Sequence, residues 1–216
     1  MRALKSLLHK KEEVIMRKVV MLDPGHGGHR PGGVNKRFGL KEKDIVLKVA
    51  EYAMNELVDN YPRIIPFLTR KGDVHVSLPD RCEQANYREV DIFVSIHTNA
   101  RVLKGRYGIE IETFYCRGSG RGRTLASIIQ KNLLSEQTPI RTIDRGVKIG
   151  EVWSKRKQKK VPYYVLRNTA MPSVLVELGF LSDDEEAVVL NNPWHQGAMG
   201  KSIAQSIDEF FNQEDI

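Results

Sequence analysis

Apolar residues along this chain fall into short continuous runs that alternate with longer stretches of helical periodicity. Continuous runs of the kind that build strands buried on both faces occupy residues 19–22, 92–96 and 172–177. Apolar residues recur on one face at helical spacing within residues 42–58, 125–133 and 203–211. This order predicts an α/β fold, a three-layer sandwich in which helices cover both faces of a mostly parallel twisted sheet.

Three further segments give weaker signals. Residues 64–69 are apolar enough for another strand, and Pro66 places it near an edge because proline cannot donate a hydrogen bond to a neighbouring strand. Residues 108–115 alternate apolar and polar side chains, which predicts a half-buried strand. Residues 141–160 show no such pattern, and we expect them to be the least ordered part of the chain.

Length and composition predict one domain. A chain of 216 residues with 41% hydrophobic content can bury one full core. We expect residues 1–17 to form an N-terminal extension and residues 18–216 to form a single domain. In the extension, charged residues 10–13 follow the apolar positions, which argues against a standard secretion signal. No apolar run reaches the roughly 18 residues that a membrane-spanning helix needs.

The positive charge of the chain restricts the class of partner. A net charge of +7 and a pI near 9.4 favour an anionic partner, such as nucleic acid, anionic lipid or an acidic wall polymer. No nucleic-acid-binding motif is recognisable, so we expect no nucleic acid. Cys82 and Cys116 show no paired spacing, and therefore predict neither a zinc knuckle nor a disulfide framework.

One histidine lies where a predicted buried strand breaks into a glycine-rich loop, in the sequence DPGHGG at residues 23–28. Glycines on both sides of His26 leave the backbone free for unusual dihedral angles and let a ligand approach closely. His26 is therefore either a metal ligand or a loop histidine that is hydrogen-bonded to its neighbours.

Three more candidate residues are expected at the same end of the sheet. His97 and Glu177 each follow a predicted strand, and Glu42 begins a predicted helix. In an open parallel sheet, ligands bind beyond the carboxyl ends of the strands. Two histidines and one glutamate can hold zinc and leave one position open for water, while a second glutamate transfers protons. Taken alone, Glu42 would more often be a solvated charge that complements the helix dipole.

Short motifs, each weak alone, occur in an order and spacing that are specific together, at residues 22–28, 39–43, 68–70, 95–100, 108–110, 165–167 and 171–182. In these motifs nearly the whole chain resembles the zinc-dependent N-acetylmuramoyl-L-alanine amidases of the amidase_3 type, which are cell-wall hydrolases. The resemblance implies one Zn²⁺ per chain on His26, Glu42 and His97, with Glu177 as the catalytic carboxylate. It also implies that residues 18–216 are one zinc amidase domain.

The resemblance also points to supporting residues. Glu110, Asn99 and Arg167 match motif positions, which implies a role beside the metal ligands or in contact with substrate. For Glu110, a surface carboxylate on a half-buried strand is an equal alternative. Arg81 and Asn86 match as well, and we expect them to brace loops rather than to contact substrate.

The implied reaction is hydrolysis of the amide bond between N-acetylmuramic acid and the L-alanine of the stem peptide in peptidoglycan. The same metal set could serve a zinc carboxypeptidase or endopeptidase that acts on stem peptides. A non-catalytic wall-binding module is an alternative from another class. We expect the protein to act at the bacterial cell wall after release by lysis or export by a route that the sequence does not reveal.

A basic run at residues 155–160 lies beside Trp153. Such a run is usually a solvated loop. Near a cell-wall site it could instead steer anionic glycan strands, with Trp153 offering a flat face for a sugar.

Overall fold

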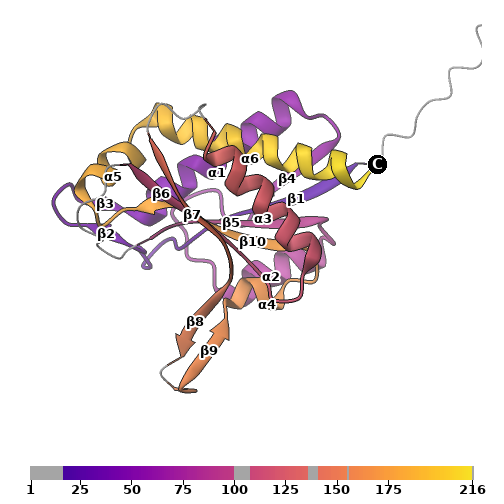
Figure 1. The fold of residues 1–216 in the computed structure, drawn as a ribbon, viewed down its shortest axis with the longest axis horizontal. Coiled ribbons are helices and arrows are strands. Elements are labelled where there is room, and N and C mark those ends of the chain that lie inside the picture. The colour runs from indigo at the N-terminus through magenta and orange to yellow at the C-terminus, as the bar shows by residue number, and fades with distance from the viewer. Residues whose placement is uncertain (1–16, 100–107, 136–140, 155, 216) are drawn as a thin grey trace, which may run out of the picture.

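The computed structural model describes residues 17–99, 108–135, 141–154 and 156–215. Figure 1 shows three layers, in which a six-stranded sheet lies between helices. The strand order is β4 (Ile64–Leu68), β1 (Lys18–Pro24), β5 (Ile92–Asn99), β10 (Ser173–Phe180), β6 (Ile109–Tyr115) and β7 (Thr142–Ile149). Strands β10 and β6 are antiparallel, and all other neighbours are parallel. The predicted three-layer α/β sandwich is confirmed.

Helices cover the two faces of the sheet unequally. The larger layer contains α1 (Glu42–Asn60), α3 (Gly120–Leu133) and α6 (Pro193–Glu214), and α6 packs against both of the others. The smaller layer contains α2 (Leu78–Tyr87) and α4 (Tyr164–Asn168), which contact each other. A short helix, α5 (Asp184–Leu190), follows β10. Within the described ranges, no helix combines the length and the apolar character that crossing a membrane requires.

Two small hairpins lie outside the central sheet. One pairs β2 (Val34–Asn35) with β3 (Leu40–Lys41), directly before α1. The other pairs β8 (Glu151–Ser154) with β9 (Lys159–Pro162), between β7 and α4.

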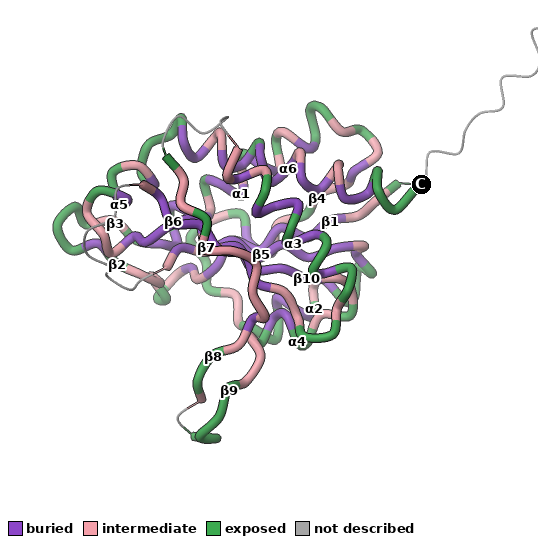
Figure 2. Tube along the Cα trace, in the orientation of Figure 1, coloured by how far each residue is buried: buried purple, intermediate pink, exposed green. Residues whose placement is uncertain are grey.

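The continuous apolar runs become strands because their side chains pack on both faces of the sheet. In β1, Val20 and Leu22 belong to the core beneath α1, α3 and α6, whereas Met21 belongs to the core beneath α2 and α4. All three residues are at most 1% exposed. Each side chain of this size contributes about 1.5–3 kcal/mol when it is fully buried. Figure 2 shows the resulting central strands as buried along most of their length.

Two segments differ from the predictions. Residues 141–160, expected to be the least ordered, contain β7 and, among the residues described, β8 and the start of β9. Strand β7 lacks an apolar pattern. It lies at an edge of the sheet, and its charged side chains pair with carboxylates of β6. Strand β6 was expected to be half-buried. It is buried on both faces, because its carboxylates are paired with these charged side chains of β7. Pro66 does lie in an edge strand, β4, as predicted.

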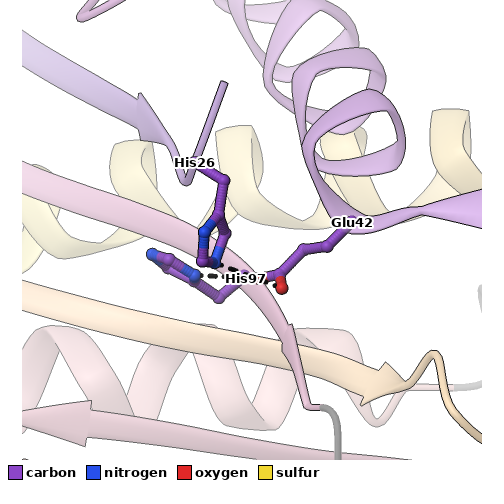
Figure 3. Close-up of side chains that lie close together, drawn as sticks. All are labelled: His26, Glu42 and His97. Carbon is purple, nitrogen blue, oxygen red and sulfur yellow. Dashed lines mark hydrogen bonds and ion pairs between the residues drawn. The ribbon is translucent and has the colours of Figure 1, made fainter. Parts of the chain in front are cut away.

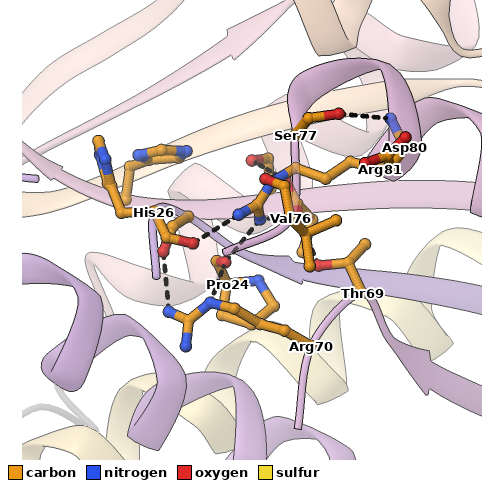
Figure 4. Close-up of polar contacts among 12 residues, drawn as sticks. Pro24, His26, Thr69, Arg70, Val76, Ser77, Asp80 and Arg81 are labelled. Carbon is orange, nitrogen blue, oxygen red and sulfur yellow. Dashed lines mark hydrogen bonds and ion pairs between the residues drawn. The ribbon is translucent and has the colours of Figure 1, made fainter. Parts of the chain in front are cut away.

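Two buried arginines hold the loop that carries His26 (Figure 4). Arg81, from α2, donates hydrogen bonds to the carbonyl oxygens of Pro24 at 2.8 Å and of His26 at 2.5 Å. Arg70, which follows β4, donates to the carbonyl oxygens of Pro24 at 3.0 Å and of Gly25 at 2.8 Å. His26 itself has a φ of 58°, a left-handed conformation that strains a non-glycine residue. The arginines therefore stabilise a strained loop.

A buried ion pair between Asp23 and Arg81 anchors this arrangement. The Asp23 carboxylate accepts a hydrogen bond from Arg81 at 2.5 Å and from the hydroxyl groups of Thr69 and Ser95 at 2.7 Å each. Burial alone raises the pKa of Asp23, but Arg81 and the two hydroxyl groups outweigh burial and lower that pKa. Further along α2, Asn86 binds the backbone at the end of α4. Arg81 and Asn86 thus brace loops, as predicted.

Replacing Arg81 tests how much this buried ion pair contributes to the free energy of unfolding. We expect Arg81→Met to lower the free energy of unfolding by about 3–5 kcal/mol, because it leaves the Asp23 carboxylate buried without its cation. The matched control is Arg117→Met, which breaks an exposed ion pair with Glu151 and should cost about 0–1 kcal/mol. Urea unfolding of both variants measures the difference, and equal losses would contradict the role of Arg81.

Candidate metal centre and catalytic cleft

Three side chains from different elements meet near the carboxyl ends of β1 and β5 (Figure 3). His26 comes from the loop after β1, Glu42 is the first residue of α1, and His97 lies in β5. The Nε2 atom of His26 lies 3.2 Å from Oε2 of Glu42, and the Nδ1 atom of His97 lies 2.9 Å from Oε1. One ligand atom from each residue lies within 4.8 Å of the others. The three predicted ligands are therefore close enough together to hold one metal ion.

The carboxylate of Glu42 is fixed from both sides. Its Oε2 accepts a hydrogen bond from the backbone of Gly33 at 2.7 Å, and its Oε1 accepts one from the backbone of Thr98 at 3.0 Å. Burial alone raises the pKa of Glu42, but hydrogen bonds with His26 and His97 outweigh it and hold that pKa well below the ordinary value. Position in the first turn of α1 also favours negative charge. Glu42 is therefore an oriented, ionised carboxylate.

Opposing effects act on the pKa of the His97 imidazole. Burial lowers the pKa of His97, but the hydrogen bond with Glu42 and nearby carboxylates outweigh burial and raise it. A metal ion binds neutral imidazole, so metal binding competes with protonation of His97. Close packing around the ring leaves no room for a larger neighbour, since a Cβ atom at Gly25 would overlap the His97 imidazole.

Glu177 lies beside this group without belonging to it. In β10 it is paired in register with His97 of β5. Its Oε2 atom is buried and has no hydrogen-bond partner among the described residues. Burial raises the pKa of Glu177 to about 8, with further increases from Glu42 and Glu112 and an opposing effect from His97. Glu177 is thus a buried carboxyl group whose raised pKa favours the protonated form near neutral pH.

Two hollows meet at these residues. The larger has a volume of about 630 Å³ and extends toward α2 and α4, where its walls include Leu175 and Tyr163. The smaller has a volume of about 540 Å³ and extends along the loops that precede α1. His26, His97 and Glu177 line both. Burial, with nearby Glu177, raises the pKa of Tyr163 to about 12, so its hydroxyl group stays protonated in the cleft wall.

The structure places the three predicted supporting residues in different surroundings. Asn99 lines the smaller hollow and donates a hydrogen bond to Glu112 at 2.8 Å. Glu110 is only 1% exposed and accepts a hydrogen bond from Arg145 at 2.6 Å, so the surface-carboxylate alternative is wrong. Arg167 is exposed on α4 and lies outside the lining of both hollows. Of the three, Asn99 is the one that lines the site.

Glu112 is a neighbour of the site that the sequence interpretation missed. It lies directly across from Glu177 in the antiparallel pairing of β10 with β6. Its carboxylate accepts hydrogen bonds from Asn99, from Arg145 and from Lys148. Burial raises the pKa of Glu112, but these three donors outweigh burial and lower it. The sequence feature that could have identified Glu112 is its spacing from Glu110, which puts both residues on one face of a strand.

Fold and site together define an α/β domain with a candidate metal centre beyond the carboxyl ends of parallel strands. The family described as N-acetylmuramoyl-L-alanine amidase matches residues 20–209. The chain is 35% identical over 197 residues to the endolysin of Bacillus phage SPP1, covering 91% of this chain and 67% of that protein. It is 34% identical over 203 residues to YqiI, an uncharacterised protein of Bacillus subtilis, covering 93% and 88%.

A solved structure extends the likeness to the fold. The N-acetylmuramoyl-L-alanine amidase from Clostridium difficile 630 is 30% identical, with a TM-score of 0.79, and the match covers 92% of this chain and 99% of that one. The chain belongs to the N-acetylmuramoyl-L-alanine amidase family, Amidase_3. It is a peptidoglycan hydrolase that cleaves the bond between N-acetylmuramic acid and L-alanine.

The raised pKa of Glu177 predicts how the stability of the metal-free protein depends on pH. Between about 4.5 and 8 the folded state binds a proton at Glu177 that the unfolded state does not, so the free energy of unfolding falls as pH rises. Glu177→Gln removes this dependence. The free energy of unfolding of the variant should therefore rise relative to that of the parent protein as the pH approaches 8. Urea unfolding in chelator at several pH values measures the gap, with exposed Glu83→Gln as control. A gap that stays constant with pH would contradict the prediction.

Proposed function

We propose that this amidase uses one zinc ion held by His26, Glu42 and His97, with Glu177 as the general base and acid. The observation that carries the proposal is the grouping of three donor atoms within 4.8 Å, beside Glu177, whose buried carboxyl oxygen has no hydrogen-bond partner among the residues that the structure describes. Two nitrogens and one carboxylate oxygen are a donor set of catalytic zinc sites that keep one position open.

The spacing of the donor atoms agrees with zinc. Bonds of about 2.0–2.2 Å in a tetrahedral site place neighbouring donors roughly 3.4 Å apart. His26 lies 3.2 Å from Oε2 of Glu42 and His97 lies 2.9 Å from Oε1, and one ligand atom of each residue lies within 4.8 Å of the others, so the three donors could close around one ion by small shifts of the side chains. Gly32 leaves this space clear, because a Cβ atom there would overlap Glu42 and His26.

Zinc, when bound, polarises the substrate carbonyl and lowers the pKa of a water molecule toward about 7. Glu42 keeps the two imidazoles oriented through its own bonds to the Gly33 and Thr98 amides. Glu177 first releases its proton to solvent, which added positive charge nearby would favour. Its carboxylate then accepts a proton from the water that attacks the amide carbonyl carbon, and passes that proton to the amine nitrogen of L-alanine as the amide bond breaks.

Tyr163 is suited to position the substrate in the larger hollow. Its hydroxyl group stays neutral at working pH and can therefore donate a hydrogen bond without adding charge. The substrate is peptidoglycan, and the protein acts on it at the bacterial cell wall.

Digestion of purified cell wall tests the reaction. We expect new amino termini of L-alanine, loss of that release in chelator, and recovery when zinc is returned, because the donor set holds a removable ion. Amino-terminal labelling of the soluble peptides measures the products. New termini other than L-alanine would indicate a peptidase, and full activity in chelator would contradict a metal requirement.

Matched variants separate the ligands from the proton-transfer group. His97→Ala should lose both zinc and activity, because a three-residue site has no spare ligand. Glu177→Gln should keep zinc and lose activity by roughly a hundredfold to ten-thousandfold, because the amide cannot accept a proton. Zinc content and turnover are measured on the same preparations. Loss of zinc in Glu177→Gln would make Glu177 a ligand, and retained turnover would place the base elsewhere.

A further inference from the structure

The β8–β9 hairpin stands away from the rest of the domain, as Figure 1 shows below the sheet. Its two ends are closed by a hydrogen bond of 2.9 Å from the backbone of Tyr163 to that of Gly150, and Gly150 binds Tyr115 of β6 in turn. Tyr163 is also part of the wall of the larger hollow. The hairpin is therefore an arm whose base is continuous with the catalytic cleft.

This arm exposes apolar side chains that neither core covers. Val152 is 48% exposed and Trp153 is 57% exposed. A two-stranded hairpin without a packed face is at best marginally stable in water, so its apolar residues gain little by folding alone. Large exposed aromatic side chains are typical of binding surfaces.

The arm is also strongly cationic. Its described residues include four cations, Arg156, Lys157, Lys159 and Lys160, all exposed. Its single carboxylate, Glu151, is already paired with Arg117. None of the four cations forms an ion pair within the described parts of the chain. Trp153 and Lys160 lie directly opposite each other across the hairpin, so one face combines an aromatic ring with an ammonium group.

We propose that this arm is a docking surface for the peptidoglycan strand whose stem enters the cleft, a proposal that rests on the proposed function. Trp153 packs against a sugar face, and the cations bind carboxylates of neighbouring stem peptides. Such a strand carries both features along its length, and the continuity of the arm with the cleft favours the substrate polymer over a membrane or another wall polymer.

The test compares a long substrate with a short one. The arm variant carries four substitutions, Arg156→Gln, Lys157→Gln, Lys159→Gln and Lys160→Gln. Its substrates are cell wall freed of teichoic acid and a small soluble muramoyl peptide that cannot reach the arm. At low ionic strength, we expect these substitutions to raise the amount of wall needed for half-maximal rate. This rise should be about ten times larger than the rise in the half-maximal concentration of the small substrate. Trp153→Ala should raise it about threefold, and Trp153→Phe less.

A control variant removes the same charge from the opposite helical layer, with Lys48→Gln, Arg123→Gln, Lys131→Gln and Lys201→Gln, all at exposed positions. This control should leave the ratio of the two substrates unchanged. An equal effect of both variants would show that net charge alone acts, and would overturn the proposal. So would an unchanged ratio in the arm variant, or an effect that appears only on wall that retains teichoic acid.

Two further measurements keep this test separate from the proposed reaction. Sedimentation with the same wall measures binding directly and does not depend on catalysis. If the parent protein releases no L-alanine termini, the proposed reaction is wrong, but the comparison of wall binding still tests the proposed role of the arm. Binding to vesicles of phosphatidylglycerol and phosphatidylcholine tests the membrane alternative. Loss of vesicle binding with intact wall binding in the arm variant would overturn the proposal.

Discussion

The in-register pairing of β1, β5 and β10 is the constraint on which the candidate site depends. Pro24 lies beside Ile96, and Glu177 lies beside His97. Successive side chains of a strand point to opposite faces, so a slip of one residue would carry a site residue to the wrong side of the sheet. The two cores oppose such a slip, because it would also exchange the side chains that each core buries.

Three glutamates near one another have different protonation properties, and their surroundings explain why. Glu42 and Glu112 are buried but receive several hydrogen bonds, which lower the pKa of each. Glu177, opposite Glu112 in the sheet, has no hydrogen-bond partner for Oε2 within the described part of the chain, and burial raises its pKa to about 8. Carboxylates whose environments move their pKa values apart are suited to different tasks. The roles proposed for the two residues, ligand for Glu42 and proton carrier for Glu177, agree with this division.

Features suited to function also carry a cost in stability. His26 has a left-handed backbone, and Glu177 has a buried oxygen that finds no hydrogen-bond partner in the described ranges. Each feature is of the kind that costs roughly 1–3 kcal/mol. The buried hydrogen bonds of Arg70 and Arg81 to the His26 loop act in the opposite direction, because they satisfy carbonyl groups that a strained loop would leave unpaired.

Local features of the sequence sufficed for the layers of the fold, because buried strands and amphipathic helices leave periodic patterns. They also predicted His26, His97 and Glu177 at one end of the sheet, whereas Glu42 was singled out only by its place among the motifs. The roles of these four residues follow from the resemblance and stay predictions. The surroundings of Glu177 were decided by tertiary structure alone. Glu112 is buried, and the partly exposed side chains of Arg145 and Lys148 reach it because β6 pairs with both β10 and β7. These contacts join segments that are distant in the sequence, for which no local pattern exists.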